Sequence, residues 1–322
     1  MRAFELTQVT DLDEARSLLG GDGRVRPLAG GTDLLPLMKA DLIAPERLVN
    51  LKQVPELQAG IAETSDGLAI GALTPLAALE AHPAVRGRYT ALAEAAGLAA
   101  TPQLRNMATL GGNLLQRPRC WYFRNALFHC WLKGGDECHA REGENQFHGV
   151  LSDSPCVAVH PSDPPAALLA LGAEVRLTGR SLPLSEFFTL PTSDHRLENG
   201  LAPDELILSV HVPTTAAGTR STYLKAMNRK VWAFALVGVA VVVRFEPDTR
   251  QVAEARLVLN GVAPIPWRAA AAEQELVGHE LSERTISRAA EAAVSDAHPL
   301  EHNAYKLPLC QAMIRQALSS FA

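Results

Sequence analysis

The sequence predicts an α+β fold with more than one domain, and three observations support this. Residues 24–99 alternate short extended stretches with helical patterns. Residues 103–161 lose this periodicity and gather aromatic, glycine, histidine and cysteine side chains. After residue 219, two strong strand patterns precede three alanine-rich helical patterns. A chain of 322 residues is too long for one small core and suits two or three packed domains.

The first hundred residues predict strands at 24–29 and 46–51, with a helix through Leu34–Met38 between them. A hairpin follows, in which 60–64 and 67–73 are joined through Ser65-Asp66-Gly67. Thr74-Pro75 has the chemistry of a helix start, and 86–99 predicts one continuous helix.

The second half returns to regular patterns at Ser162 and has an irregular stretch at 191–203 and a linker at 213–218. The predicted elements there are a helix at 164–171, strands at 173–177 and 205–212, strands at 239–245 and 255–260 joined through 246–249, and helices at 269–276, 283–295 and 309–318.

Composition and charge exclude several classes of function. The hydrophobic content of 47% with 20% charged residues is typical of a globular protein. A net charge of −5 argues against a nucleic-acid partner, which would require a basic face. The longest apolar run, 232–243, is shorter than the ~20 residues that span a bilayer, and the first residues lack the apolar core of a secretory signal. We therefore expect a cytoplasmic protein without a membrane partner.

Two glycine pairs look suited to a phosphate-bearing ligand. No G-x-G-x-x-G follows a first strand, so an ordinary dinucleotide fold has no support. Gly30-Gly31 and Gly111-Gly112 instead stand in stretches with hydroxyl, amide or carboxylate neighbours, 28–35 and 108–116. Adjacent glycines let backbone N–H groups face outward, and two such loops could hold a pyrophosphate. Taken singly, each pair is equally well explained as a tight turn with positive φ.

Four of the five cysteines fall in one stretch with the spacing C-x9-C-x7-C-x17-C, namely Cys120, Cys130, Cys138 and Cys156. Without an export signal we do not expect disulfides. Neither paired zinc knuckles nor the bacterial ferredoxin spacing is present. The stretch holds few aliphatic residues for a core, so a buried cluster bound by four thiolates would supply the missing stability.

Alternatives to a cluster remain open at this point. Zinc could be bound by some of these cysteines together with a histidine, or all four could be free thiols. Cys310 stands alone in an apolar helix and is expected to be a buried small side chain. The histidines are expected to be hydrogen-bonded loop residues. Those concerned are His129, His139, His148 and His160. Basic residues could offset the negative charge of a cluster, namely Arg117, Arg119, Arg124, Lys133 and Arg141.

The glycine loops carry a resemblance that extends over the whole chain. The stretch 28–35 resembles the G-G-T-x-L motif, and 103–113 resembles the second flavin loop, of the FAD-binding (medium) subunit in the xanthine dehydrogenase and molybdenum hydroxylase family. In most relatives the second loop runs directly to a Ser-Asp pair, whereas about forty residues precede Ser162-Asp163 here. That insertion is similar to one in periplasmic aldehyde oxidoreductases and in 4-hydroxybenzoyl-CoA reductases, where cysteines bind a [4Fe–4S] cluster.

The resemblance implies a fold and its boundaries. Two FAD-binding subdomains of the vanillyl-alcohol-oxidase type would occupy 1–58 and 59–213, with an iron–sulfur insertion at 117–160. A small α+β domain would occupy 219–322.

The resemblance also assigns contacts to FAD. The first loop would wrap the pyrophosphate with Arg26, Pro27, Leu28, Ala29, Gly30, Gly31, Thr32, Asp33 and Leu34. The second flavin-contacting set would be Ala100, Thr109, Gly112, Asn113, Leu115 and Gln116. Asp163 would contact the sugar portion, Ile207 would pack against the cofactor, and Lys225 would approach the isoalloxazine ring. Without the resemblance, Asp163 and Lys225 would be interpreted as ordinary surface charges. Gln116 stands where many relatives have a small hydroxyl residue.

The implied function is electron transfer. A large partner subunit would hold the molybdenum cofactor and a small one two [2Fe–2S] clusters, and FAD would pass electrons to an external acceptor. A partner with an export signal would carry the chain to the periplasm. The alternatives are a 4-hydroxybenzoyl-CoA reductase-like β subunit, a self-sufficient flavin oxidoreductase and a zinc-stabilised scaffold. No constellation for substrate chemistry is evident in the chain itself, in agreement with a carrier role.

Overall fold

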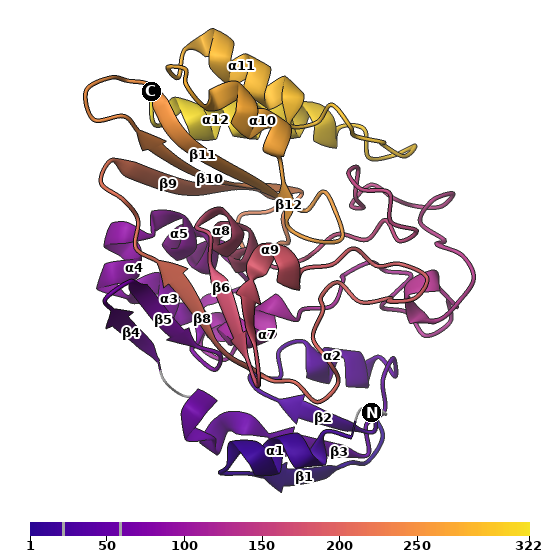
Figure 1. Cartoon of the computed structure of the whole chain (residues 1–322). Helices are drawn as coiled ribbons and strands as arrows, with labels where there is room; N and C mark the ends of the chain where they lie inside the picture. The colour runs from indigo at the N-terminus through magenta and orange to yellow at the C-terminus, as the bar shows by residue number, and fades with distance from the viewer. Residues whose placement is uncertain (21–22, 58–59) are drawn as a thin grey trace.

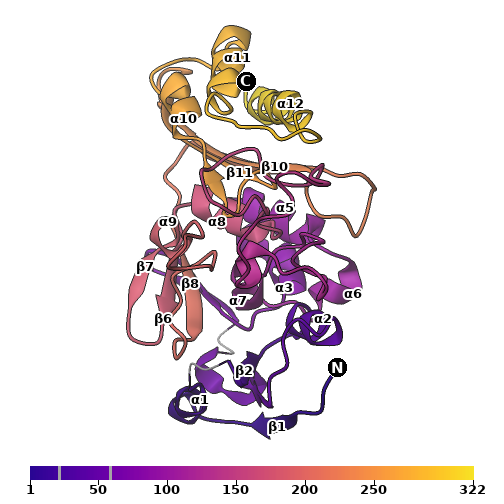
Figure 2. The ribbon, with the colours of Figure 1, turned by 90° about the vertical axis from the view of Figure 1, so that its right-hand side faces the viewer.

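Three β-sheets follow one another along the molecule (Figure 1). The computed structural model describes residues 1–20, 23–57 and 60–322. The sheet of the N-terminal residues lies at one end, a five-stranded sheet lies in the middle, and a four-stranded sheet lies at the other end beneath the last three helices. The side view shows the same order (Figure 2). The predicted α+β class is confirmed.

The first sheet is parallel and has the order β1-β3-β2. The predicted strands are confirmed as β2 (Val25–Leu28) and β3 (Arg47–Asn50), with α2 (Leu34–Lys39) between them. The chain begins with β1 (Glu5–Gln8), which the sequence did not predict. Its side chains are mostly exposed, so it lacks the apolar alternation that marks a strand. Asp11 caps α1 (Leu12–Leu18) by accepting from the Glu14 N–H at 2.9 Å.

The middle sheet is antiparallel in the order β4-β5-β8-β6-β7. Its strands are β4 (Ile61–Thr64), β5 (Gly67–Gly71), β6 (Glu174–Leu177), β7 (Ser181–Pro183) and β8 (Ile207–Pro213). The predicted hairpin is β4–β5. Around the sheet lie α3 (Leu76–Ala81), α4 (Pro83–Arg88), α5 (Thr90–Leu98), α6 (Pro102–Arg105), α7 (Leu110–Leu114), α8 (Pro164–Ala170) and α9 (Leu184–Phe187).

The single helix predicted at 86–99 is wrong. The chain forms two helices, α4 and α5, separated at Tyr89, whose backbone is non-helical with φ −127° and ψ 52°. The Tyr89 side chain is completely buried in the core of the middle domain. Packing of this ring therefore outweighs the high helix propensity of the alanine-rich stretch around it.

The last sheet is antiparallel with the order β12-β11-β10-β9. Its strands are β9 (Thr219–Ala226), β10 (Val237–Phe245), β11 (Val252–Asn260) and β12 (Trp267–Arg268). The helices α10 (Ala270–Leu276), α11 (Glu283–Ala292) and α12 (Lys306–Ser319) cover its outer face. Val239, Leu257 and Ile314 share one apolar core, which explains why strands and helices stack.

The middle and last sheets belong to one continuous body. Tyr223, Ala240 and Val258 of the last sheet lie in the same core as the helices of the middle domain. Glu94 on α5 accepts hydrogen bonds from the hydroxyl of Thr222 at 2.9 Å and the N–H of Tyr223 at 2.7 Å. These contacts hold β9 against α5, so the last sheet forms one wall of the middle domain.

The cysteine-bearing stretch 115–163 has little regular structure, with one short 3₁₀ turn η3 (Trp131–Lys133). Hydrogen bonds attach this stretch to the last domain. The N–H groups of Val150 and Leu151 both donate to the carbonyl of Val262, at 2.8 and 3.0 Å. The Asn303 amide donates to the carbonyl of Gly149 at 3.0 Å. Long-range hydrogen bonds thus order a segment that has no periodic pattern of its own.

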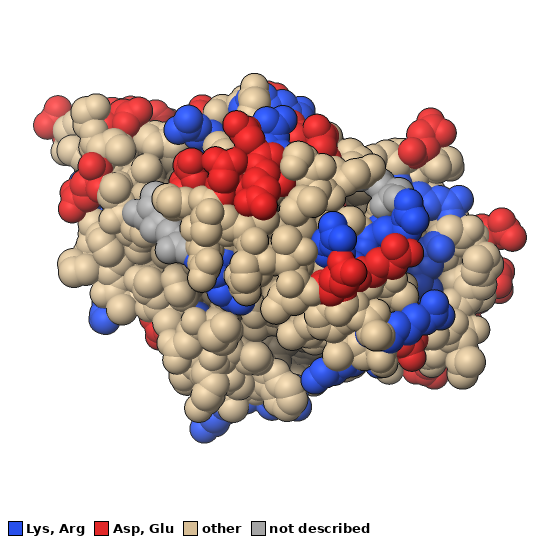
Figure 3. Space-filling view, turned by 90° about the horizontal axis from the view of Figure 1, so that it is seen from below, with Lys and Arg blue, Asp and Glu red and all other residues tan. Residues whose placement is uncertain are grey.

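Charges of both signs share the face seen from below, so that face is not uniformly basic (Figure 3). Within the described part of the chain, no helix has the length and apolar character needed to cross a bilayer.

Candidate functional site

The two glycine loops meet in space. A Cβ added at Gly30 would lie 1.8 Å from the carbonyl oxygen of Met107, next to the second loop. Only glycine allows this approach of two backbones. Gly31 has a φ of +72°, which also favours glycine. Residues 27–35 are all half-buried, as expected of a loop that lines an open site.

The first loop presents unused backbone donors. Among the hydrogen bonds of the described residues, none has the N–H of Gly30, Gly31, Thr32 or Asp33 as its donor. The Leu35 N–H donates to the carbonyl of Gly31 at 3.1 Å and closes the turn beneath them. Successive free N–H groups in such a turn form an anion-binding concavity. The loop therefore has the donors that a phosphate-bearing ligand requires.

The second loop is held by its own polar side chains. Thr109 caps α7 by accepting from the Gly112 N–H at 3.2 Å. Asn113 is buried, donates to the Thr109 carbonyl at 2.8 Å and accepts from the Ser162 hydroxyl at 2.9 Å. Thr109 and Asn113 thus shape the loop, and their contact with flavin stays a prediction. Leu115 and Gln116 are half-buried at its end.

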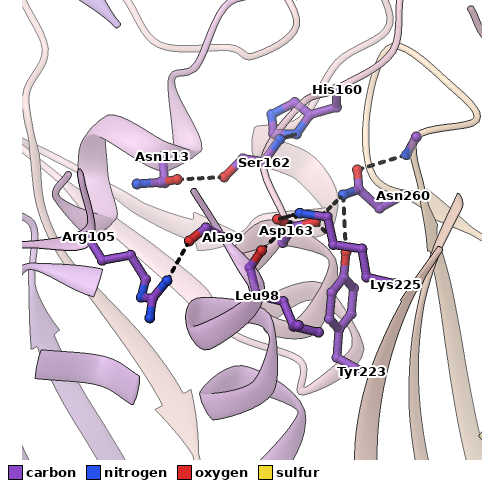
Figure 4. Close-up of polar contacts among 11 residues, drawn as sticks. Leu98, Ala99, Arg105, Asn113, His160, Ser162, Asp163, Tyr223, Lys225 and Asn260 are labelled. Carbon is purple, nitrogen blue, oxygen red and sulfur yellow. Dashed lines mark hydrogen bonds and ion pairs between the residues drawn. The ribbon is translucent and has the colours of Figure 1, made fainter. Parts of the chain in front are cut away.

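A buried polar group joins the second loop to the last sheet (Figure 4). The Asp163 carboxylate accepts from the Tyr223 hydroxyl at 2.6 Å, the Lys225 ammonium at 2.7 Å and the Asn260 amide at 3.2 Å. The side chains of Lys225 and Asp163 are only 1% and 3% exposed. Their interpretation as ordinary surface charges is therefore wrong.

The charges in this group influence one another strongly. Burial raises the pKa of Asp163, and the adjacent Lys225 ammonium opposes this. Burial, followed by the charge of Asp163, raises the pKa of Tyr223 well above its usual value. The Tyr223 hydroxyl is thus a neutral donor, and Lys225 supplies the positive charge that a buried carboxylate requires.

Lys225 also reaches the turn that carries Ala100. Its ammonium donates to the carbonyl of Leu98 at 3.0 Å, and Arg105 donates to the carbonyl of Ala99 at 3.1 Å. Ala100 itself has a φ of +50°, a strained conformation for a residue with a Cβ. Such strain persists where surrounding contacts impose it, here beside Lys225. Ile207 lies at the start of β8 and is buried in the middle core.

The four clustered cysteines come together in one small apolar core. Cys130 and Cys156 are buried there with Leu37, Trp131 and other apolar side chains, and Cys120 and Cys138 pack against it. A hydrogen bond with Cys156 lowers the pKa of Cys138 to about 6, and burial raises the pKa of Cys120 to about 11. Cys310 lies apart from them, completely buried in the core of the last domain.

A ligand set is shown neither for the predicted cluster nor for the zinc alternative. Within residues 1–20, 23–57 and 60–322, no three or more His, Cys, Asp or Glu side chains are grouped so that they could hold a metal ion. Nε2 of His148 lies 3.1 Å from Sγ of Cys120, and Nδ1 of His160 accepts from the Ser162 N–H at 3.4 Å. His139 pairs with Glu137 at 3.1 Å. These three histidines have hydrogen-bonding partners, as expected.

The arginines near the cysteines bind carboxylates that lie outside the insertion. Nη1 of Arg119 and Nη2 of Arg124 each lie 2.8 Å from Oδ1 of Asp33. Nη1 of Arg117 lies 3.3 Å from Glu198, a buried residue that the sequence did not single out. Glu198 stands in an irregular polar stretch, where no local pattern distinguishes a buried carboxylate from an exposed one. Lys133 donates to the Asn125 carbonyl instead, and Arg141 to those of Ser154 and Pro155.

Comparison with known proteins agrees with this geometry. Residues 2–215 match the family "FAD binding domain in molybdopterin dehydrogenase", and residues 222–321 match the "CO dehydrogenase flavoprotein C-terminal domain". The chain is 35% identical to the aldehyde oxidoreductase FAD-binding subunit of Escherichia coli, over 99% of this chain and 98% of that one. It is 32% identical to the carbon monoxide dehydrogenase medium chain of Hydrogenophaga pseudoflava, over 98% and 96% of the two chains.

The fold agrees as well. A solved structure of carbon monoxide dehydrogenase from Hydrogenophaga pseudoflava matches 99% of this chain and 96% of that one, with a TM-score of 0.78 and 31% identity. The matches extend over both domains and both glycine loops. The chain therefore belongs to the family of FAD-binding medium subunits of molybdenum hydroxylases, and is the flavoprotein component of an oxidoreductase.

Proposed function

We propose that this chain binds FAD and a [4Fe–4S] cluster, and transfers electrons between the [2Fe–2S] clusters of a small partner subunit and an external acceptor. A large partner subunit would hold the molybdenum cofactor. The E. coli relative is named as a subunit of an aldehyde oxidoreductase, which favours an aldehyde as the substrate of the assembled enzyme. In this proposal residues 1–58 and 59–213 form two FAD-binding subdomains, the second of which contains the iron–sulfur insertion 117–160, and residues 219–322 form a separate C-terminal domain. The boundary at 58 and 59 lies outside the described residues.

The observation that carries the flavin part is the contact between two glycine loops, one of which offers a row of free N–H groups. When bound, FAD would exchange electrons one or two at a time. The first loop, Arg26 to Leu34, would hold its pyrophosphate. Asp163 and Lys225 would place polar atoms beside the sugar and ring portions, and the hydrogen bonds of Tyr223 and Asn260 would keep that carboxylate oriented.

The cluster part rests on four cysteines of one insertion that share a single apolar core. A [4Fe–4S] cluster is held by four cysteine thiolates, which is the number of cysteines that the insertion supplies. The backbone N–H of Ala158 also donates to the sulfur of Cys156, at 3.5 Å. Hydrogen bonds of this kind stabilise and tune sulfur-ligated clusters.

An absorption spectrum of anaerobically purified protein tests both parts at once. We expect flavin bands together with broad iron–sulfur absorbance, and co-purification of a large and a small subunit. The isolated chain should not oxidise an aldehyde, because no substrate chemistry is assigned to it. Protein that contains neither flavin nor iron would refute the proposal.

The variant Cys138→Ala tests the ligand set. We expect it to lose the iron and sulfide while FAD stays at least partly bound, because Cys138 lies outside both glycine loops. Cys310→Ala is the matched control, since it removes a buried thiol of the last domain and should retain the full iron content. Equal iron and sulfide in the two variants would contradict the assignment of Cys138.

A further inference from the structure

Asp33 holds an unexpected position in the first glycine loop. It directly follows the free N–H groups of Gly31 and Thr32 and precedes α2. The motif G-G-T-x-L, which this loop resembles, specifies no residue at this place and so does not account for a carboxylate there. A carboxylate beside a phosphate site is also electrostatically unfavourable unless cations neutralise it. The side chain therefore requires a separate explanation.

Its partners all come from the start of the cysteine-bearing insertion. Oδ1 lies 2.8 Å from Nη1 of Arg119 and 2.8 Å from Nη2 of Arg124. Oδ2 accepts from the backbone N–H of Arg117 at 2.9 Å. Both oxygens are thus bound by residues 117–124, a stretch that also contains Cys120. The side chain of Asp33 is 14% exposed, so water screens these contacts only weakly.

The arginines are in turn fixed to the insertion itself. Arg124 donates to the carbonyls of Pro118 at 2.7 Å and Arg117 at 2.8 Å, and so closes the backbone around Cys120. Its own backbone N–H donates to the carbonyl of Cys120 at 2.9 Å. The position of the Cys120 backbone therefore determines where the Arg124 guanidinium can meet Asp33.

The arginines also retain unused donors. Buried nitrogens without a hydrogen-bond partner occur on each of them, namely Nε of Arg117, Nε of Arg119 and Nη1 of Arg124. Three guanidinium groups face two carboxylates here, those of Asp33 and Glu198. The net positive charge favours an anion near the first loop, and it is supplied by the insertion rather than by the loop itself.

We propose that Asp33 is a positioning residue that couples the four-cysteine segment to the first FAD loop. An assembled cluster fixes Cys120 and the arginines beside it, and these hold Asp33 and the free N–H groups in the conformation that receives the pyrophosphate. Loss of the cluster releases this attachment and weakens FAD binding. The coupling is reciprocal, so bound FAD also stabilises the cluster. This inference rests on the proposed function.

A double-mutant cycle measures the coupling. Four forms of the assembled complex are compared: the parent, the single variant Asp33→Asn, the single variant Cys138→Ala and the double variant that carries both changes. Each is stripped of flavin and titrated with FAD by flavin fluorescence. With Asp33 present, we expect Cys138→Ala to raise the Kd for FAD about tenfold, or about 1.4 kcal/mol. With Asp33→Asn, the same cysteine change should alter the Kd by less than about threefold.

A matched control separates this role from a general loss of charge. Oε2 of Glu5 on β1 accepts from Nη2 and Nε of Arg47 on β3, at 2.7 and 3.0 Å, in an exposed ion pair. The variant Glu5→Gln should therefore leave the tenfold effect of Cys138→Ala unchanged. Asp33→Glu keeps the negative charge and should restore part of the coupling. If Asp33→Asn fails to fold, Arg119→Gln removes one arm of the contact with Asp33 intact and should also reduce the coupling.

The outcomes distinguish this inference from the function on which it rests. If the parent complex contains iron and FAD, and Cys138→Ala loses the iron without any change in FAD affinity, the coupling is refuted while the proposed function stands. An equal tenfold effect with and without Asp33 would remove Asp33 from the connection. A parent complex without iron would refute both.

Discussion

Gly30 and Asp163 show how single positions define the geometry of the proposed flavin site. Gly30 allows two backbones to meet, because any side chain would collide with the Met107 carbonyl. Asp163 is the opposite case, a side chain whose burial is tolerated because Tyr223, Lys225 and Asn260 donate to it. Gly30 must lack a side chain, and Asp163 must have all of its donors. In both cases the residue that imposes the requirement is distant in sequence.

The variant Gly30→Ala should separate the two glycine loops. The added Cβ would lie 1.8 Å from the Met107 oxygen, so one backbone must move. We expect FAD affinity to fall at least about tenfold, and the free energy of unfolding to fall by about 1–3 kcal/mol. FAD titration and denaturant unfolding measure the two quantities.

Gly87→Ala is the control for this change. Gly87 lies in α4, and nothing stands within 4 Å of a Cβ built there. This variant should bind FAD normally and gain about 0.5–1 kcal/mol of stability. If Gly30→Ala behaves in the same way, the loops do not meet as described.

At the level of secondary structure, α12 anchors the cysteine-bearing insertion. Lys306 near its start is completely buried and donates to the carbonyls of Gly261 at 2.7 Å and Phe147 at 3.1 Å. Asn303 and Tyr305 donate to carbonyls of the same segment, those of Gly149 and Gln146. The start of α12 and the residues just before it thus satisfy backbone acceptors of a segment that has little regular structure of its own.

Lys306 should make stability depend on pH. Burial lowers the pKa of Lys306 to about 7, from 10.5 in the unfolded chain. Between these values the unfolded chain binds the proton more strongly, so stability rises as the pH increases. We expect a gain of about 1.4 kcal/mol per pH unit in this window, measured by denaturant unfolding at pH 7 and pH 9.

Lys306→Met should remove this gain and also lower the stability at pH 9, where two carbonyls lose their donor. The exposed Lys52 provides the comparison, and Lys52→Met should retain the full gain. An identical pH dependence in Lys306→Met and in the parent protein would show that Lys306 is not the responsible group.

At the scale of the whole molecule, the domains at residues 2–215 and 222–321 share one hydrophobic core. Side chains of β9, β10 and β11 pack among the helices of the middle domain. The Lys225–Asp163 pair crosses the same boundary and lies beside the second flavin loop (Figure 4). The last domain is thus packed into the middle domain and contributes Lys225 to the buried polar group around Asp163.

Lys225→Met should therefore destabilise the entire protein. It leaves the Asp163 carboxylate buried without its counter-charge, for which we expect a loss of about 3–5 kcal/mol in the free energy of unfolding. Arg244→Met breaks the more exposed pair with Glu254 and should cost only about 0–1 kcal/mol. The double variant Lys225→Met with Asp163→Asn should recover part of the loss. Similar losses in the two single variants would contradict the role assigned to the buried pair.

Local patterns in the sequence were sufficient for much of this fold. The β4–β5 hairpin, β10, β11 and the last three helices follow from periodicity and turn residues, because short-range geometry dictates both. Each glycine loop also carries its chemistry within a few neighbouring residues, so its recognition did not require knowledge of the distant chain.

Contacts between distant residues could not be predicted in this way. The pairing of β1 with β3, the burial of Glu198 beside Arg117 and the break at Tyr89 depend on which surfaces meet after folding. Asp33 is the clearest example, because its arginine partners lie more than 80 residues further along the chain. A charged residue has the same local pattern whether water or a guanidinium group solvates it, and only the packing of the folded chain determines which one does.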